Sequence, residues 1–203
     1  MKKLVYRWQA VAMGSDLAPG FLVASPSLLD PHFRRSVVLL VEHRDEGSLG
    51  FVINRPGEVT LPEVAEALGL DSPEAAAPAA QVVVGGPVAP ETGWIVCEHE
   101  VGAALAKGEL VRVSEGLAVS ASRDLLVALL QAQSKSRMLL ALGYAGWGPG
   151  QLDQEIAQGA WIPVDLDESI VFHTPFEERW SAALKTLGID PARLTVVGSG
   201  MAS

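Results

Sequence analysis

The sequence Gly143-Tyr144-Ala145-Gly146-Trp147-Gly148-Pro149-Gly150-Gln151-Leu152-Asp153-Gln154-Glu155-Ile156 joins a glycine-rich segment to the beginning of a helix. Its four glycines allow the backbone to turn tightly, and its two aromatic rings can anchor such a turn in a core. Leu152 and Ile156 then recur at helical spacing, beside the polar pair Gln151 and Glu155. The stretch therefore predicts a strand-to-helix turn that leads into a short helix over 151–158.

A continuously apolar run, Met138-Leu139-Leu140-Ala141-Leu142, stands just before this stretch. Continuous rather than alternating hydrophobicity is typical of a strand that is buried on both faces. We therefore predict an interior strand over 136–144, and we expect the glycine-rich turn to leave from its end.

The rest of the chain alternates irregularly between strand-like and helix-like segments. Strands are predicted over 21–24, 36–42, 49–54, 81–85, 93–98, 110–114, 117–120, 161–164 and 169–172, and helices over 61–70, 123–133 and 176–187. Gly47 predicts a hairpin turn over 45–48, and the alanine- and proline-rich residues 71–80 are expected to form a connector. Because strands cluster while helices are inserted irregularly, the sequence predicts a single α+β domain with a mixed sheet.

The charge balance restricts the kind of partner. The chain has 15 basic and 24 acidic residues, and its formal net charge of -9 repels polyanions such as DNA. The basic residues form no block beyond Lys2-Lys3 and the pair Arg34-Arg35, so direct DNA binding is not expected. No apolar run is long enough to span a bilayer, so no membrane association is expected. The lone Cys97 has no partner for an intrachain disulfide, which favours a reducing, cytoplasmic location.

Further motifs accompany the glycine-rich stretch, namely Glu42-His43, Asn54-Arg55-Pro56, Gly85-Gly86-Pro87-Val88 and Trp161. Together these residues resemble the AlgH/YqgE family, bacterial proteins of unestablished biochemical activity that are often labelled transcriptional regulators. The resemblance starts near Gly20, and Asp153 stands where the family more often has glutamate. It implies one α+β domain over 20–203, with a strongly bent mixed sheet packed against several helices. Residues 1–19 are expected to be a poorly ordered extension, with translation starting at Met1 or Met13.

The motif segments fall at predicted strand ends, where the ligand sites of α/β sheets tend to gather. We therefore expect a cleft lined by His43, Asn54, Arg55, Gly85, Gly86, Trp147, Gln151 and Glu155. Arg55 and Glu155 are predicted to pair and to set the polarity of the cleft, and Trp147 is predicted to form an apolar wall. Purely structural roles, as a salt bridge and as a buried turn, stay open for the same residues.

The leading hypothesis is a regulatory protein that binds a small polar ligand or a protein partner and has no chemistry of its own. A DNA-associated transcriptional regulator is the first alternative, although the sequence contains no helix-turn-helix pattern with a basic recognition helix. The second alternative is an enzyme that uses Glu155 or His43 as an acid or base. No cofactor or metal is expected, because an extended Glu98-His99-Glu100 would direct the imidazole and the two carboxylates to opposite faces.

Overall fold

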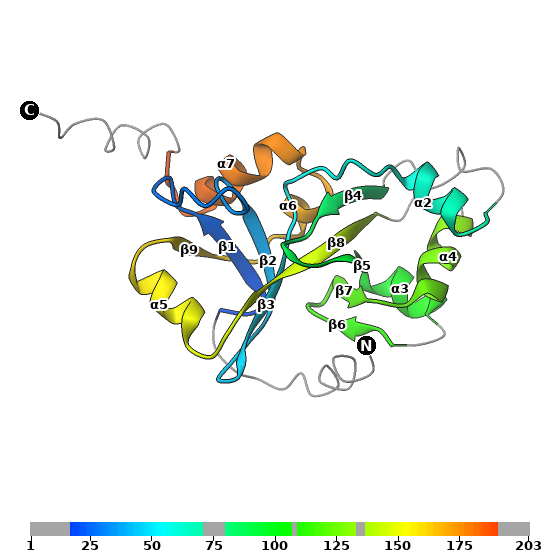
Figure 1. Ribbon diagram of the computed structural model, residues 1–203, viewed down its shortest axis with the longest axis horizontal. Helices are drawn as coiled ribbons and strands as arrows, with labels where there is room; N and C mark the ends of the chain where they lie inside the picture. The colour runs from blue at the N-terminus through cyan, green and yellow to red at the C-terminus, as the bar shows by residue number, and fades with distance from the viewer. Residues whose placement is uncertain (1–16, 71–79, 107–108, 133–136, 191–203) are drawn as a thin grey trace, which may run out of the picture.

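The computed structural model describes residues 17–70, 80–106, 109–132 and 137–190. In these residues a strongly curled, nine-stranded sheet packs against helices (Figure 1). The strands are β1 (Gly20–Ala24), β2 (Val37–Arg44), β3 (Gly47–Val52), β4 (Ala80–Val84), β5 (Val88–Glu98), β6 (Val111–Arg112), β7 (Leu117–Ser120), β8 (Met138–Trp147) and β9 (Trp161–Asp165). The helices are α2 (Leu61–Ala67), α3 (His99–Leu105), α4 (Arg123–Gln131), α5 (Gln151–Ala157), α6 (Glu168–Phe172) and α7 (Phe176–Thr186).

The central strand of the sheet is β8, which joins its two halves. It pairs in parallel with β4 and antiparallel with both β5 and β3. One half continues from β5 to β7 and β6, and the other continues from β3 through β2 and β1 to β9. Since parallel and antiparallel pairings occur together, the predicted mixed sheet is confirmed.

The predicted strand-to-helix turn is confirmed only over residues 148–150, because β8 extends through Trp147 into the first part of the glycine-rich stretch. Tyr144 pairs with Val88 of β5, and Trp147 pairs with Ser48 of β3. Gly143 has a φ of 72°, and a Cβ at this position would lie 2.5 Å from the carbonyl oxygen of Gly86. This glycine therefore lets β8 bend closely past another segment instead of ending the strand.

The hairpin of β2 and β3 contains an irregularity that reverses the direction of the side chains at its tip. Leu40 pairs with Gly50, but the next pair is Glu42 with Leu49, so β2 has one extra residue. In a regular strand His43 would share the face of Val41. The bulge instead places His43 opposite Ser48, on the face that carries Trp147.

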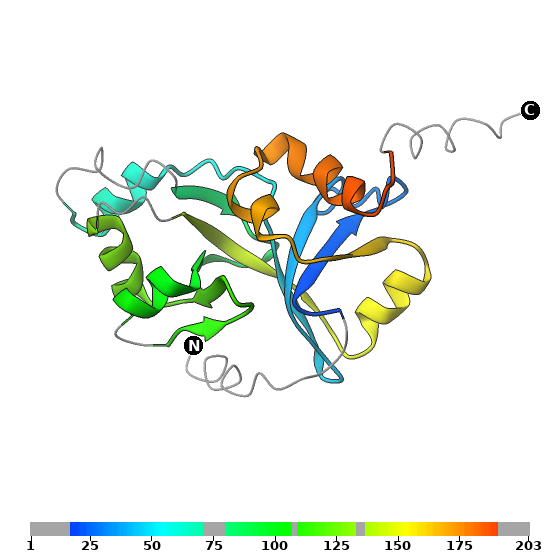
Figure 2. The ribbon, with the colours of Figure 1, turned by 180° about the vertical axis from the view of Figure 1, so that it is seen from behind.

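Three apolar clusters hold the helices against the sheet. The largest spans both halves of the sheet, from β1 and β2 to β5 and β7, and packs them against α6 and α7, including Trp180. A second lies beneath α2 and α4 on the β4–β5–β8 half, and a third lies beneath α5. Figure 2 shows α2 and α4 at one end of the molecule and α5 at the other. All four helices predicted from apolar periodicity are confirmed within a few residues. Ser122 begins α4 as expected, because its Oγ accepts a hydrogen bond from the amide of Leu125 at 3.3 Å.

Two local predictions are wrong, because side chains and burial favour helix over strand. Residues 169–172, predicted as a strand, belong to α6, where the Asp167 carboxylate accepts a hydrogen bond from the amide of Ser169 at 2.9 Å. His99, expected in an extended segment, begins α3. The expected connector over 71–80 and the expected extension over 1–19 lie largely outside the described residues.

An arginine that the sequence analysis did not single out fixes α7 to the sheet. Arg179 is fully buried and donates hydrogen bonds to the carbonyl oxygen of Ile53, to that of Thr174 at 2.9 Å and to Oε1 of Gln81 at 3.0 Å. Its guanidinium lies 4.5 Å from the ring centroid of Phe176. Desolvation lowers the pKa of Arg179 to about 10, yet carbonyl oxygens and an aromatic face satisfy the charge in place of a carboxylate.

Candidate functional site

The eight residues predicted to line one cleft are divided between two places. His43, Trp147, Gln151 and Glu155 gather around α5, since Ser48 is the strand partner of both His43 and Trp147. Asn54 follows Ser48 by six residues of extended chain, which corresponds to about 20 Å. The first group therefore lies at one end of β3, and Asn54 lies at the other.

The carboxylate of Glu155 is the centre of the first group. Its Oε2 accepts hydrogen bonds from the indole N–H of Trp147 at 3.0 Å and from that of Trp161 at 2.8 Å, and its Oε1 accepts one from the Gln151 amide at 2.8 Å. We call these four residues the Glu155 network. The network ties α5 to β8 and β9, and it satisfies two indole N–H groups whose side chains are almost fully buried.

The predicted ion pair between Arg55 and Glu155 is wrong. Arg55 donates from Nη2 to the carbonyl oxygen of Arg34 at 3.2 Å, at the far end of β3. Trp147, predicted to form an apolar wall of the cleft, is only 7% exposed. It packs against Phe33 and Trp161, with ring centroids 6.3 and 5.8 Å away. The first group is therefore a packed and hydrogen-bonded core region.

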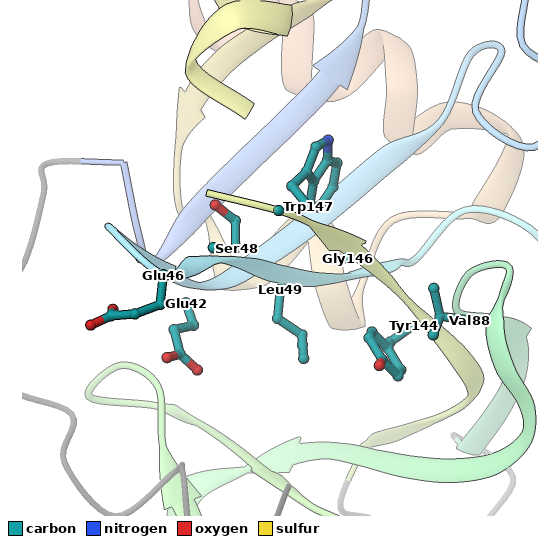
Figure 3. A pocket seen from close by; sticks show the side chains of 10 residues that line it. Glu42, Glu46, Ser48, Leu49, Val88, Tyr144, Gly146 and Trp147 are labelled. Carbon is teal, nitrogen blue, oxygen red and sulfur yellow. The ribbon is translucent and has the colours of Figure 1, made fainter. Parts of the chain in front are cut away.

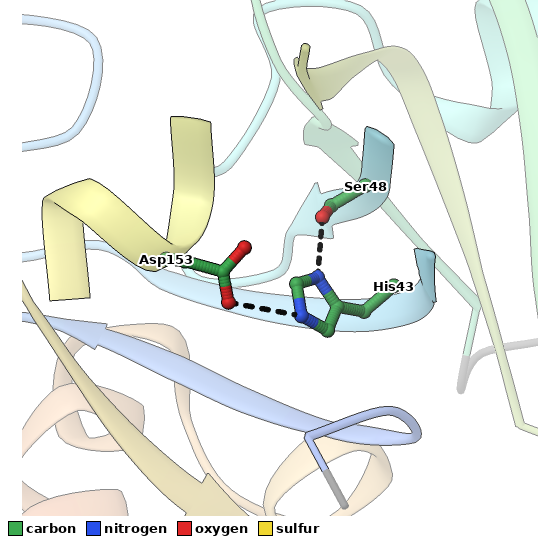
Figure 4. Close-up of polar contacts among 3 residues, drawn as sticks. All are labelled: His43, Ser48 and Asp153. Carbon is green, nitrogen blue, oxygen red and sulfur yellow. Dashed lines mark hydrogen bonds and ion pairs between the residues drawn. The ribbon is translucent and has the colours of Figure 1, made fainter. Parts of the chain in front are cut away.

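The imidazole of His43 links the hairpin tip to α5 (Figure 4). Its Nδ1 lies 2.7 Å from Oγ of Ser48, and its Nε2 lies 3.4 Å from a carboxylate oxygen of Asp153. Ser48 and His43 are each 8% exposed, whereas the side chain of Asp153 is 60% exposed. In Ser-His-Asp hydrolases Nε2 faces the serine and Nδ1 faces the aspartate, so the ring nitrogens here have the opposite partners.

A cavity of about 340 Å³ lies on the other face of these strands (Figure 3). We call it the hairpin cavity, and it is lined by Glu42, Glu46, Gly47, Ser48, Leu49, Val88, Tyr144, Gly146, Trp147 and Gly148. In Figure 3 the side chains of Leu49, Tyr144 and Glu42 lie on one side of the strands, and those of Ser48 and Trp147 point to the other. Of the eight predicted residues only Trp147 borders it. The strand alternation around Leu49 and Glu42 is the sequence signal that would have identified this wall.

A second cavity, of about 380 Å³, lies against α7, and we call it the α7 cavity. It is lined by Arg35, Asn54, Phe176, Glu177, Trp180 and Ser181. Asn54 accepts a hydrogen bond from the amide of Val37 and donates one to the carbonyl oxygen of Arg35, both at 2.8 Å. Asn54 thus holds the start of β2 in place beside the cavity.

The predicted glycines Gly85 and Gly86 serve close backbone packing. The Gly85 amide donates to the carbonyl oxygen of Leu142 at 2.8 Å, and its own carbonyl oxygen accepts from Val52 at 2.7 Å. A Cβ on Gly86 would lie 2.2 Å from the carbonyl carbon of Tyr144. Side chains at these two positions would therefore collide with β8.

The other candidates for chemistry are the thiol of Cys97 and possible metal-binding side chains. Cys97 is buried, and desolvation raises the pKa of its thiol to about 12, which keeps the thiol protonated and unreactive at neutral pH. Within the described ranges, no group of three or more histidine, cysteine or acidic side chains is placed to hold a metal ion. Nor does any helix of those ranges have the length and apolar character needed to cross a membrane.

The curled sheet and its helices define a single α+β domain, and comparison with known proteins identifies the family. A model of the AlgH-like family matches residues 21–192. A UPF0301 protein from Anaeromyxobacter sp. (strain K) is 46% identical over 190 residues, which cover 92% of this chain and 95% of that protein. One from Methylococcus capsulatus is 42% identical and covers 88% of this chain and 93% of its own length. The chain therefore belongs to the AlgH-like family, as its motifs indicated.

Solved structures confirm the fold class. The solution structure of the AlgH protein from Pseudomonas aeruginosa is 35% identical and superposes with a TM-score of 0.72, over 95% of this chain and 99% of that one. A crystal structure of a protein from Corynebacterium diphtheriae has a TM-score of 0.64 at 23% identity, which supports the fold alone. The predicted α+β domain with a strongly bent sheet is thereby confirmed.

Proposed function

We propose that this protein is a non-catalytic regulatory protein of the cytoplasm that binds a small polar ligand or a protein partner in the hairpin cavity. The observation that carries this proposal is the cavity itself, whose volume of about 340 Å³ lies within the range typical of ligand sites. Of the predicted residues, Trp147 borders the cavity, while His43, Gln151 and Glu155 support its wall from the opposite face. The other predicted residues do not border the hairpin cavity and have no part in this proposal, namely Asn54, Arg55, Gly85 and Gly86.

The lining favours a positively charged group on an apolar stem. Glu42 and Glu46 provide carboxylates at the hairpin end, and Leu49, Val88 and Tyr144 provide apolar surface (Figure 3). Oε1 of Glu42 already forms an ion pair with Nε of Arg44 at 3.1 Å. The exposed carboxylate of Glu46 is therefore the acceptor open to a ligand. An amine on an apolar body has this chemistry, and so does a lysine or arginine side chain of a partner protein.

The state of the acid–base groups supports binding without chemistry. The carboxylate of Glu155 accepts three hydrogen bonds from the Glu155 network. Both ring nitrogens of His43 have partners, and the Cys97 thiol is buried. Because the hydrogen-bonding capacity of these groups is used inside the protein, we assign them a structural role and not a catalytic one.

Thermal denaturation with phenethylamine tests the proposal, with phenylpropionate as the matched anion. A ligand at about 100 times its Kd adds about 2.7 kcal/mol to the free energy of unfolding, which is several degrees in Tm for a chain of this size. We expect phenethylamine alone to raise Tm, and Glu46→Gln to remove the effect. Glu58→Gln, an exposed acid outside the cavity, is the control. Equal effects of the amine and the anion, or no effect of Glu46→Gln, would reject the proposal.

The Ser48–His43–Asp153 arrangement favours one second candidate, a hydrolase in which His43 acts as a base. Its residue types match those of acyl-transfer enzymes, while the reversed ring nitrogens and the burial of Ser48 oppose it. A fluorophosphonate probe followed by peptide mass spectrometry separates the two functions. Labelling at Ser48 that His43→Ala abolishes would support the hydrolase, and we expect no labelling.

A further inference from the structure

Arg35 adopts a backbone conformation that arginine rarely takes. Its φ is 56°, in the left-handed region, where the Cβ of an L-residue is crowded by the following carbonyl group. Glycine or asparagine at this position would fit with less strain. Asn54 holds the strained segment by donating a hydrogen bond to the carbonyl oxygen of Arg35. Strain of this kind, fixed by neighbouring residues, is a pointer to a functional site.

The guanidinium of Arg35 is held in place without using its hydrogen-bond donors. It lies 5.1 Å from the ring centroid of Trp180, and it makes no hydrogen bond or ion pair with any residue in the described part of the chain. Trp180 is itself fixed, since its indole donates to the carbonyl oxygen of Ala24 at 2.9 Å. The planar donor fork of Arg35 therefore borders the α7 cavity in a defined position.

Two more arginines belong to the segments that adjoin Arg35, in a chain with a net negative charge. Arg55 donates to the carbonyl oxygen of Arg34, the neighbour of Arg35. Burial lowers the pKa of Arg55, and the charge of Arg34 lowers it further, while Asp30 opposes both. Because the chain has nine more acidic than basic residues, three arginines in these two adjoining segments are a local excess of positive charge.

We propose that Arg35 binds a small organic anion in the α7 cavity, with Arg34 and Arg55 adding positive charge nearby and the apolar part of the anion lying against Phe176 and Trp180. We call this the Arg35 site. A guanidinium fork matches the oxygens of a phosphate or a carboxylate, and Phe176 and Trp180 contribute apolar surface to the lining. The Arg35 site does not rest on the function proposed above, because the two cavities share no lining residue.

Glu177 limits the charge of the ligand. It lines the same cavity from the first turn of α7, and it is exposed. Its carboxylate repels a polyanion more strongly than a single phosphate or carboxylate group. The Arg35 site thus favours a small anion over nucleic acid.

Isothermal titration with phenyl phosphate and with benzoate tests the Arg35 site, and phenol is the uncharged control. We expect one or both anions to bind and phenol not to bind; which anion binds more tightly identifies the headgroup. Arg35→Gly should weaken binding by about tenfold or more, the size of a lost charge-assisted hydrogen bond. Glu177→Gln should tighten it, and Arg123→Gln, which removes an arginine that donates to the Leu68 carbonyl oxygen elsewhere, should leave it unchanged.

The outcomes are separable from folding defects. Glycine takes the left-handed conformation readily, so Arg35→Gly should fold. Arg35→Lys keeps the charge but loses the fork, and it should also weaken binding. Equal affinity of Arg35→Gly, Arg35→Lys and the unaltered protein for the anions would overturn the Arg35 site. So would an absence of anion binding, or binding of duplex DNA alone with a steep loss on raising the salt concentration.

Discussion

The two ends of the β2–β3 hairpin differ in how completely their polar groups are satisfied. Around α5, the Glu155 carboxylate accepts three hydrogen bonds. Two of them come from buried indole N–H groups, which are thereby satisfied. Around the start of β2, Arg35 is strained and offers donors that no described residue accepts. The Glu155 network is thus built for stability, whereas the start of β2 retains hydrogen-bond donors that are open to an anion.

The largest effect is expected from Glu155→Ala. It would leave the indole N–H groups of Trp147 and Trp161 buried without an acceptor, each costing about 1–3 kcal/mol. We expect the free energy of unfolding to fall by roughly 3 kcal/mol, or about 10 °C in Tm. Denaturant unfolding measures this, with the exposed Gln154→Ala as control. A loss no greater than that of the control would contradict a structural role for the network.

Asn54→Ala should have the next largest effect. It removes both hydrogen bonds that hold the start of β2, at a cost of about 2 kcal/mol. Because Arg35 would no longer be held in its left-handed conformation, phenyl phosphate should also bind more weakly. The matched control is His32→Ala, an exposed position in the loop that precedes β2. Unchanged stability and unchanged affinity together would show that Asn54 does not position Arg35.

Arg35→Gly should change stability little, although it removes a large side chain. Relief of backbone strain gains about 1 kcal/mol, and loss of the contact with Trp180 costs a similar amount. The expected change in the free energy of unfolding is therefore within about 1 kcal/mol of zero. A loss well above that value in chemical denaturation would mean that Arg35 is retained for the fold alone.

Cys97 should show the smallest effect at neutral pH. Its pKa is raised to about 12 by burial, so the folded thiol keeps a proton that an unfolded thiol loses above about pH 8.5. Its contribution to stability is thus complete below that pH and is lost as the pH rises towards 12. A thiol-specific reagent at pH 8 should react only after denaturant is added. Rapid reaction of the folded protein would contradict the burial of Cys97.

Sequence patterns predicted the fold class better than the site. The apolar run at 138–142 and the amphipathic pattern over 123–133 are local signals, and they are confirmed as β8 and as α4 over Arg123–Gln131. The separation of Arg55 from Glu155 depends on sheet register, which no local pattern contains. The position of His43 depends on a one-residue bulge in β2. The left-handed conformation of Arg35 could not be predicted from its residue type, because arginine does not favour it.

The most direct test of the contrast between the two ends follows the tryptophan indole N–H resonances of the isotope-labelled protein while phenyl phosphate is added. The chain has five tryptophans, of which Trp180 lies at the Arg35 site and Trp147 and Trp161 belong to the Glu155 network. We expect the resonance of Trp180 to shift to saturation while those of Trp147 and Trp161 stay fixed. Shifts confined to Trp147 and Trp161 would contradict the account, because the anion would then bind at the Glu155 network and not at the Arg35 site.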